Sequence, residues 1–196
     1  MSAADELILE VESLVAGGAS SELTDANPIL AAVEIFDPVA GTWTPTGSMS
    51  VPRYFHCATT LYDGSVLVTG GIPYAATLGP VIDAHSLATA ERWDPTTGQW
   101  HAAAPMPFGR SRHQALGWQS TVVVLGGADE QSLESAFTHT MYFDPATDTW
   151  TALAPMSSGR FNFAAVALTT GQLLVASGNG QLEGLVTDSE VLTEVV

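Results

Sequence analysis

The chain has 196 residues, and its 21 acidic side chains outnumber its 5 basic ones, so the formal net charge is −16. Phosphate recognition needs clustered lysine and arginine, so this composition argues against a nucleic-acid-binding protein and against a partner at an anionic membrane surface. Hydrophobic residues make up 46% of the chain and charged residues 13%, which indicates a chain that builds a core. We therefore expect one folded domain over residues 1–196.

Export and metal or cofactor chemistry are not expected. No apolar run reaches the ~18 to 20 residues of a membrane helix, and the start of the chain lacks the basic segment of a signal peptide, which predicts a soluble, cytoplasmic protein. A single cysteine, Cys57, excludes an internal disulfide and a cysteine-rich zinc site, and we expect its small apolar side chain to be buried. No cofactor and no metal are predicted.

A repeat organises the sequence. An aromatic residue, Asp-Pro, four residues and Trp occur three times; a Met follows each Trp by six residues, and an Arg follows each Met by four. Sixteen or seventeen residues after the Arg, a β-branched run ends in a pair of small residues. The recurring residues are Asp37, Asp94 and Asp144; Trp43, Trp100 and Trp150; Arg53, Arg110 and Arg160; and the pairs Gly70-Gly71 and Gly126-Gly127. Because they recur, we interpret them as structural, although the arginines could instead form a ring that attracts anions.

In chain order, each unit is predicted to form four short strands rich in Val, Leu, Thr and Ala. The first strand ends in a turn, clearest at Asp63-Gly64, and the second ends at the small pair, where glycine lets backbones approach closely. The third leads into the Asp-Pro turn, and the fourth carries the Trp, which we expect to pack between sheets. The first strands are predicted at 54–61, 112–118 and 161–168, and the second at 65–70, 121–126 and 172–177.

This combination of a Gly-Gly pair, Asp-Pro-x4-Trp and Met-x3-Arg at a period of about 50 residues resembles the kelch repeat. The resemblance covers about residues 13–193 and implies an all-β fold, a kelch-type β-propeller of about four four-stranded blades. Within the family, we expect the chain to resemble most the small-residue-rich bacterial kelch proteins. The approximate blades are 6–45, 53–102, 110–152 and 160–193.

Kelch propellers usually close with five to seven blades, so a chain of this length leaves three alternatives. The chain could be a piece of a longer propeller. It could close as a four-bladed ring in which residues 6–12 complete the last blade. It could also be a half-ring whose open blade edges pair with a second copy, as a homodimer.

The residues that change between units are the candidates for specificity. Two positions after the recurring arginine stand Phe55, Arg112 and Asn162, and the resemblance implies that this place looks toward the rim of the central pocket. Arg112 is the strongest single contact residue, with a solvated surface arginine as the alternative. Tyr74 and Leu78 lie in an apolar insertion after Gly71 and are expected either to contact a partner or to cap the core.

Two further repeat positions carry the same residue type in some units and a different one in others. His56 and His113 occupy one repeat position and Phe163 the third, so we interpret the position as a packing site. Glu34, Glu91 and Glu190 recur three residues before the Asp-Pro position and are interpreted as structural, while Met141 breaks that series. In the insertion, His85 is expected to be a solvated loop residue.

These features predict a non-catalytic binding module that presents propeller loops to a protein, a peptide or a small ligand. The alternative is a small-molecule enzyme, such as a sugar isomerase or mutarotase, acting in the axial pocket. The residue sets of a copper radical oxidase and of an iron-dependent specifier protein are missing from the sequence, which favours a protein without enzymatic activity.

Overall fold

The computed structural model describes residues 13–19, 29–73, 85–129, 132–180 and 184–193, and this part of the chain is all-β. Its strands form four antiparallel sheets, here called blades I to IV, and one small ribbon. Within this part of the chain, no helix is long and apolar enough to span a bilayer.

Blades II and III each have four strands, and blades I and IV each have three. Blade I contains β1 (Ser13–Ala16), β2 (Val33–Asp37) and β3 (Thr42–Pro45). Blade II contains β4 (Cys57–Thr60), β5 (Val66–Thr69), β6 (Ala90–Asp94) and β7 (Gln99–Ala103). Blade III contains β8 (Gln114–Trp118), β9 (Thr121–Leu125), β12 (Thr140–Asp144) and β13 (Thr149–Ala152). Blade IV contains β14 (Ala164–Leu168), β15 (Gln172–Ala176) and β16 (Ser189–Leu192), and the ribbon pairs β10 (Ala128–Asp129) with β11 (Ser132–Ala136).

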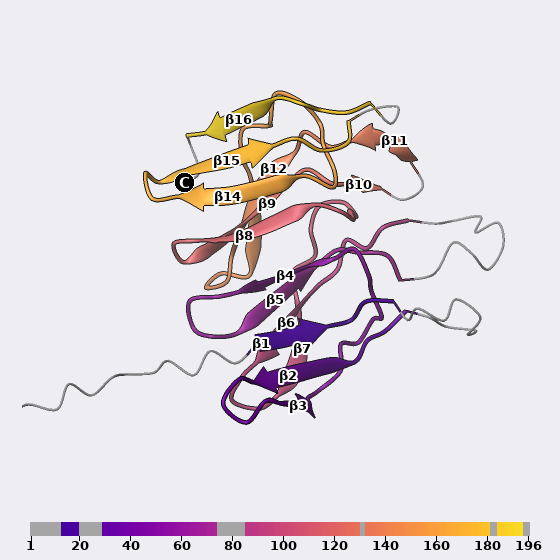
Figure 1. Ribbon diagram of the computed structural model, residues 1–196, viewed down its shortest axis with the longest axis vertical. Helices are drawn as coiled ribbons and strands as arrows, with labels where there is room; N and C mark the ends of the chain where they lie inside the picture. The colour runs from indigo at the N-terminus through magenta and orange to yellow at the C-terminus, as the bar shows by residue number, and fades with distance from the viewer. Residues whose placement is uncertain (1–12, 20–28, 74–84, 130–131, 181–183, 194–196) are drawn as a thin grey trace, which may run out of the picture.

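The blades follow one another along the long axis of the molecule, from blade I at one end to blade IV at the other (Figure 1). They form an open arc, and the all-β kelch-type architecture with its meander of strands is confirmed. The closed four-bladed ring is not the arrangement that the structure shows. Residues 6–12, which that alternative needed as an outer strand, lie outside the described residues.

The Asp-Pro turns form as the sequence chemistry requires. The side-chain oxygens of Asp37, Asp94 and Asp144 accept the backbone N–H two residues ahead, at 2.8, 2.8 and 2.9 Å. The left-handed position of the turn is taken by glycine in blades I and II and by Asp148 in blade III, whose φ is 53°. These turns fix the register of the two outer strands in blades I, II and III.

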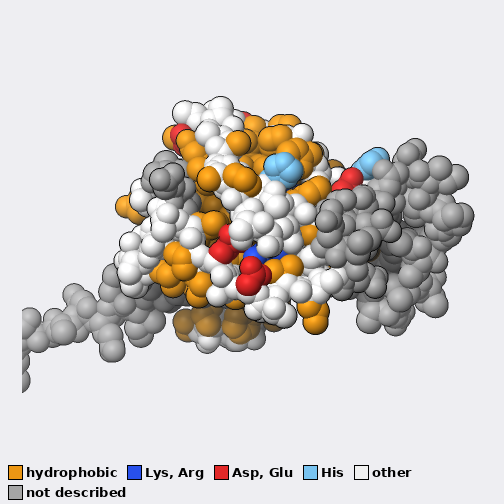
Figure 2. Space-filling model, turned by 90° about the horizontal axis from the view of Figure 1, so that it is seen from above, with side chains coloured by type: hydrophobic (Ala, Val, Ile, Leu, Met, Phe, Trp, Pro, Cys, Tyr) orange, Lys and Arg blue, Asp and Glu red, His pale blue; other side chains and the backbone are white. Residues whose placement is uncertain are grey.

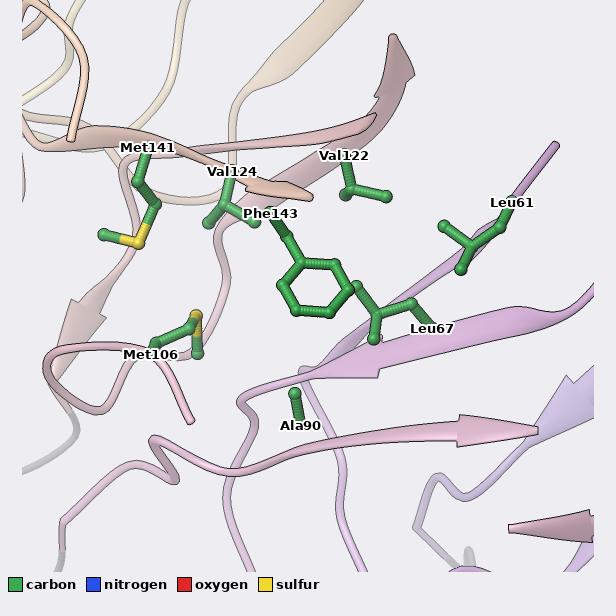
Figure 3. Packing of buried hydrophobic residues seen from close by; sticks show 8 residues of the cluster. All are labelled: Leu61, Leu67, Ala90, Met106, Val122, Val124, Met141 and Phe143. Atoms are coloured by element: carbon green, nitrogen blue, oxygen red, sulfur yellow. The ribbon is translucent and has the colours of Figure 1, made fainter. Parts of the chain in front are cut away.

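The seam between blades II and III contains the largest part of the core (Figure 3). Phe143 of β12 is 1% exposed and packs against Leu67 and Ala90 of blade II, and Met106 comes from the linker between the blades. The Trp of blade II and that of blade III each face the preceding blade, where the indole N–H donates to a linker carbonyl: Trp100 to Gly47 and Trp150 to Ala104, both at 2.7 Å. Residues that recur in the repeat therefore lie on both of the blade surfaces that meet in a seam.

The Gly pairs lie where each blade meets the next linker. The N–H of Gly71 donates to the carbonyl of Arg110, and that of Gly127 to Arg160, both at 2.9 Å. A Cβ added at Gly126 would lie 2.5 Å from the Arg160 oxygen, closer than side chains approach. Glycine is required here because the next repeat's backbone fills the space of a side chain.

Candidate functional site

Phe55, Arg112 and Asn162 form one row across three successive blades, here called the rim row. The Arg112 N–H donates to the Phe55 carbonyl at 2.9 Å, and the Asn162 N–H donates to the Arg112 carbonyl at 3.1 Å. All three have left-handed backbones, with φ of 53°, 55° and 50°. Such a conformation costs a non-glycine residue roughly 1 kcal/mol or more, and persists where the surrounding structure holds it.

A rigid base presents this row. The residue before each member, namely Tyr54, Ser111 or Phe161, makes a β-bridge to the segment that follows the small pair of the same blade. The Arg112 guanidinium stacks over the Phe55 ring, 4.4 Å from its centroid. Phe55 is 46% exposed, Asn162 is exposed and Arg112 is half-buried. The structure thus brings together the three variable residues that the repeat comparison singled out, whereas Tyr74 and Leu78 lie outside the described residues.

The recurring arginines lie in the interior and join each linker to the next blade. All three are fully buried. Arg53 donates to the Gly70 carbonyl at 2.7 Å and to Glu91 at 2.6 Å, and Arg160 donates to the Ser177 carbonyl at 3.0 Å and to Glu190 at 3.1 Å. Arg110 donates to the Gly126 carbonyl at 2.7 Å.

The carboxylates that pair with these arginines also satisfy the linker backbone. Glu91 accepts the Ser50 N–H at 2.7 Å, and Glu190 accepts the Ser157 N–H at 2.9 Å. Burial of Glu91 opposes its ionisation, but the hydrogen bonds from Ser50 and Arg53 outweigh burial, so its pKa lies below the usual value.

The repeat also matches a known protein family. The family model for the kelch motif matches residues 53–107 and 109–157, which contain blades II and III and their linkers. The chain therefore belongs to the kelch-repeat family. Mouse Kelch-like protein 15 is 27% identical over 135 residues, which cover 61% of this chain and 21% of the relative.

Two further relatives show the same partial overlap. Rat Kelch-like protein 25 is 29% identical over 113 residues, covering 58% of the chain and 18% of the relative. Beta-scruin of Limulus polyphemus is 30% identical over 102 residues, covering 52% of the chain and 11% of the relative. The matched segment is thus about a fifth or less of each relative's own length. These relatives are animal proteins, and the similarity to bacterial kelch proteins stays a prediction.

His56 and His113, which occupy equivalent positions of the kelch repeat, pack against the first glycine of the Gly pair in the preceding blade. His113 is 2% exposed, and its Nε2 lies 2.9 Å from the Thr69 hydroxyl. The His113 ring, like the Phe163 ring one blade later, lies beside the first glycine of a pair. Burial, with a smaller contribution from the charge of Arg53, lowers the pKa of His56 to about 4; burial and Arg110 hold the pKa of His113 well below its usual value. Both are neutral at pH 7.

Cys57 and His85 also have defined environments. Cys57 is half-buried, its thiol lies 3.0 Å from the His113 carbonyl, and burial raises its pKa to about 12, so it is not a reactive thiolate at neutral pH. His85 is exposed, and its Nδ1 lies 2.9 Å from a carboxylate oxygen of Asp129 in β10. Its sequence neighbour Asp83 lies outside the described residues.

Sequence reasoning did not find a polar cavity of about 440 Å³ along β6 and β7. Arg92 contributes to its wall and bonds Asp63 and Ser65, and His101 lies opposite Arg92 on the neighbouring strand. The equivalent positions of Arg92 in blades I and III are Ile35 and Tyr142. The only sign of this cavity in the sequence was Arg92 itself, an arginine that lies outside the recurring Met-x3-Arg position.

Proposed function

We propose that this chain is a non-catalytic binding module whose rim row contacts a protein or peptide. The observation that carries the proposal is the row itself: three different side chains stand at equivalent left-handed positions, are joined backbone to backbone, and lie on a buried scaffold. Membership in the kelch family supports a binding role. A sugar isomerase or mutarotase would need an enclosed axial pocket, and the described blades form an open arc.

The chemistry of the row favours a particular peptide. Arg112 can donate two parallel hydrogen bonds to a carboxylate, and the exposed face of Phe55 offers apolar contact beside it. Because the chain carries a net charge of −16, a strongly acidic partner would be repelled at long range. We therefore expect a peptide with one acidic residue next to an apolar one, in an otherwise neutral or basic segment.

Selection from a displayed random-peptide library against the purified chain tests this proposal. The variant is Arg112→Asn, because asparagine occupies the equivalent left-handed position at residue 162 and tolerates that conformation better than most residues. Loss of a charge-assisted hydrogen bond should weaken the selected peptides by about tenfold or more. Arg92→Gln, which changes an arginine away from the row, is the control and should bind as the wild type does. Peptides that bind Arg112→Asn equally well would refute the assignment.

A second proposal concerns the two outer faces of the arc, which we infer to be unfilled seams. In every internal seam, the face that one blade turns toward the next is covered by the opposite face of that next blade. Leu116 and Tyr142 of blade III, for example, pack on blade IV. The same positions on blade IV are Val166 and Val191, which are 50% and 47% exposed. Figure 2 looks onto the blade IV end and shows hydrophobic side chains spread over it.

Blade I presents the complementary face at the other end. Phe36 and Trp43 are paired across β2 and β3, with ring centroids 5.0 Å apart, and Trp43 is 50% exposed. In the isolated chain, the blade I face of one copy is expected to cover the blade IV face of another, and two such contacts close a symmetric homodimer. In a longer chain, further blades would take the same places.

A further inference from the structure

The seam that Arg110 joins differs from the other two. Where blades II and IV place Glu91 and Glu190 beside their arginines, blade III has Met141, and the linker residue whose N–H would bond that carboxylate is Pro107, which has none. Phe108, Phe137 and His139 gather instead, with ring centroids 4.7 to 5.8 Å apart. An aromatic cluster has replaced a carboxylate.

Arg110 is left with unused hydrogen-bond donors. Its side chain is fully buried, and its Nη2 has no hydrogen-bond partner among the described residues; its Nε has none either, as is also the case for Arg53 and Arg160. In Arg53 and Arg160 the same Nη2 bonds a glutamate. The rings of Phe108 and Phe137 lie 5.0 and 5.6 Å from the Arg110 guanidinium carbon and attract its charge, but they accept no strong hydrogen bond. Burial lowers the pKa of Arg110 to about 10, so it is still charged at pH 7.

A cavity of about 350 Å³ opens against this cluster. Its wall is mainly apolar and includes Phe108, His139, Met141, Trp150 and Leu153. Two of these residues define its relation to Arg110: Phe108 stacks on the guanidinium, and Met141 stands at the position from which a glutamate reaches the arginine in the other blades. The cavity therefore adjoins the space in which a carboxylate is missing.

We propose that this cavity binds a small apolar carboxylate, whose hydrocarbon part lies against Trp150 and Leu153 and whose carboxylate pairs with Arg110 in place of the missing glutamate. Because Arg110 is fully buried, the Phe108 ring must move aside to expose Nη2. A carboxylate fits better than a bulkier, fully hydrated phosphate, because the wall is apolar and a carboxylate is the group that pairs with the arginine in the other seams. The site shares no residue with the rim row and is independent of the function proposed above.

The test uses 3-phenylpropanoate as the probe, followed by saturation-transfer NMR and calorimetry. We expect it to bind the wild-type chain in the millimolar range or tighter, and the matched 3-phenylpropanamide to bind at least about tenfold more weakly, because the amide lacks the charge that pairs with Arg110. Equal affinity for acid and amide, or no binding of the acid at about 10 mM, would overturn the proposal. This comparison needs no variant.

Two substitutions at one position sharpen the result. Met141→Glu supplies the missing carboxylate from within and should abolish binding of the probe while raising the melting temperature. Met141→Gln has a similar shape without the charge, so it should bind the probe at least about tenfold more tightly than Met141→Glu does. Undiminished binding by a folded Met141→Glu chain would show that the acid does not reach Arg110, and the proposal would be wrong.

Discussion

The internal seams and the two outer faces of the arc are made from the same repeat but differ in burial. Phe143 in the seam between blades II and III is 1% exposed, while Phe36 at the same position in blade I is only half-buried beside an exposed Trp43. Val68 is fully buried, while its equivalent Val15 is 52% exposed. The pairing within each blade is alike, so the presence of a neighbouring blade decides the burial.

This difference shows that the repeat specifies a seam and not a blade alone. The Trp, the linker Arg and the recurring Glu make their contacts across the boundary between blades. A blade at the end of the arc therefore carries some of these residues without the neighbouring blade that they would contact. Glu34 shows this most simply: its equivalent Glu91 bonds Arg53 and Ser50, whereas Glu34 is exposed on the blade I face.

The largest expected effect comes from Phe143→Ala, compared with Phe36→Ala. Removing a fully buried ring leaves a cavity in the core, so Phe143→Ala should lower the free energy of unfolding by about 3 to 5 kcal/mol. Phe36→Ala should cost about 1 kcal/mol, because water already reaches much of that face. Urea denaturation at low protein concentration measures both. Equal losses would mean that the blade I face is as well covered as the seam.

The second comparison is between Glu91→Gln and Glu34→Gln. Breaking the buried pair with Arg53 should lower the free energy of unfolding by about 3 kcal/mol, since it leaves the guanidinium without its counter-charge. Glu34→Gln should change it by no more than about 0.5 kcal/mol. Chemical denaturation of the two variants checks this, and a costly Glu34→Gln would indicate that Glu34 already has a buried partner.

Acid should weaken the seams through their histidines. Because the pKa of His56 is about 4 in the folded chain and about 6.5 unfolded, the unfolded chain binds more protons below pH 6.5. The free energy of unfolding should therefore fall as pH falls from 6.5 toward 4, and further for His113, by up to about 1.4 kcal/mol per pH unit for each histidine. Denaturation at a series of pH values measures the slope.

His113→Phe is the matched variant for that slope, because Phe163 fills the same position in the next seam. It should remove the contribution of His113 and flatten the pH dependence while the chain stays folded at pH 7. An unchanged slope would show that His113 does not titrate on unfolding in this range.

A small effect on stability is expected at the rim row. Arg112→Asn should change the free energy of unfolding by less than about 1 kcal/mol, because asparagine tolerates the left-handed backbone and the hydrogen bonds of the row are made by the main chain. The same variant should lose the selected peptides. A large loss of stability in thermal denaturation would make Arg112 a structural residue.

The strand pairs and turns were predictable because the repeat supplied several copies of each signal, and the Asp-Pro turns and Gly pairs act through local backbone chemistry. The contact of Arg112 with Phe55 was only partly predictable: the equivalent positions marked the row, but stacking depends on how adjacent blades are placed. The sequence showed that Met141 replaces the recurring glutamate. That this leaves Arg110 without a carboxylate followed only from the observed bond between Arg53 and Glu91. The polar cavity at Arg92 joins strand and turn residues whose proximity no local pattern encodes.

Solution mass by light scattering across a dilution series tests most directly whether the outer faces are unfilled seams. We predict a mass that rises with concentration from 20.5 kDa toward twice that value, and a Val166→Asp chain that stays at 20.5 kDa. A folded wild-type chain that remains at 20.5 kDa at every concentration would contradict the claim, because the two exposed faces would then not recognise each other.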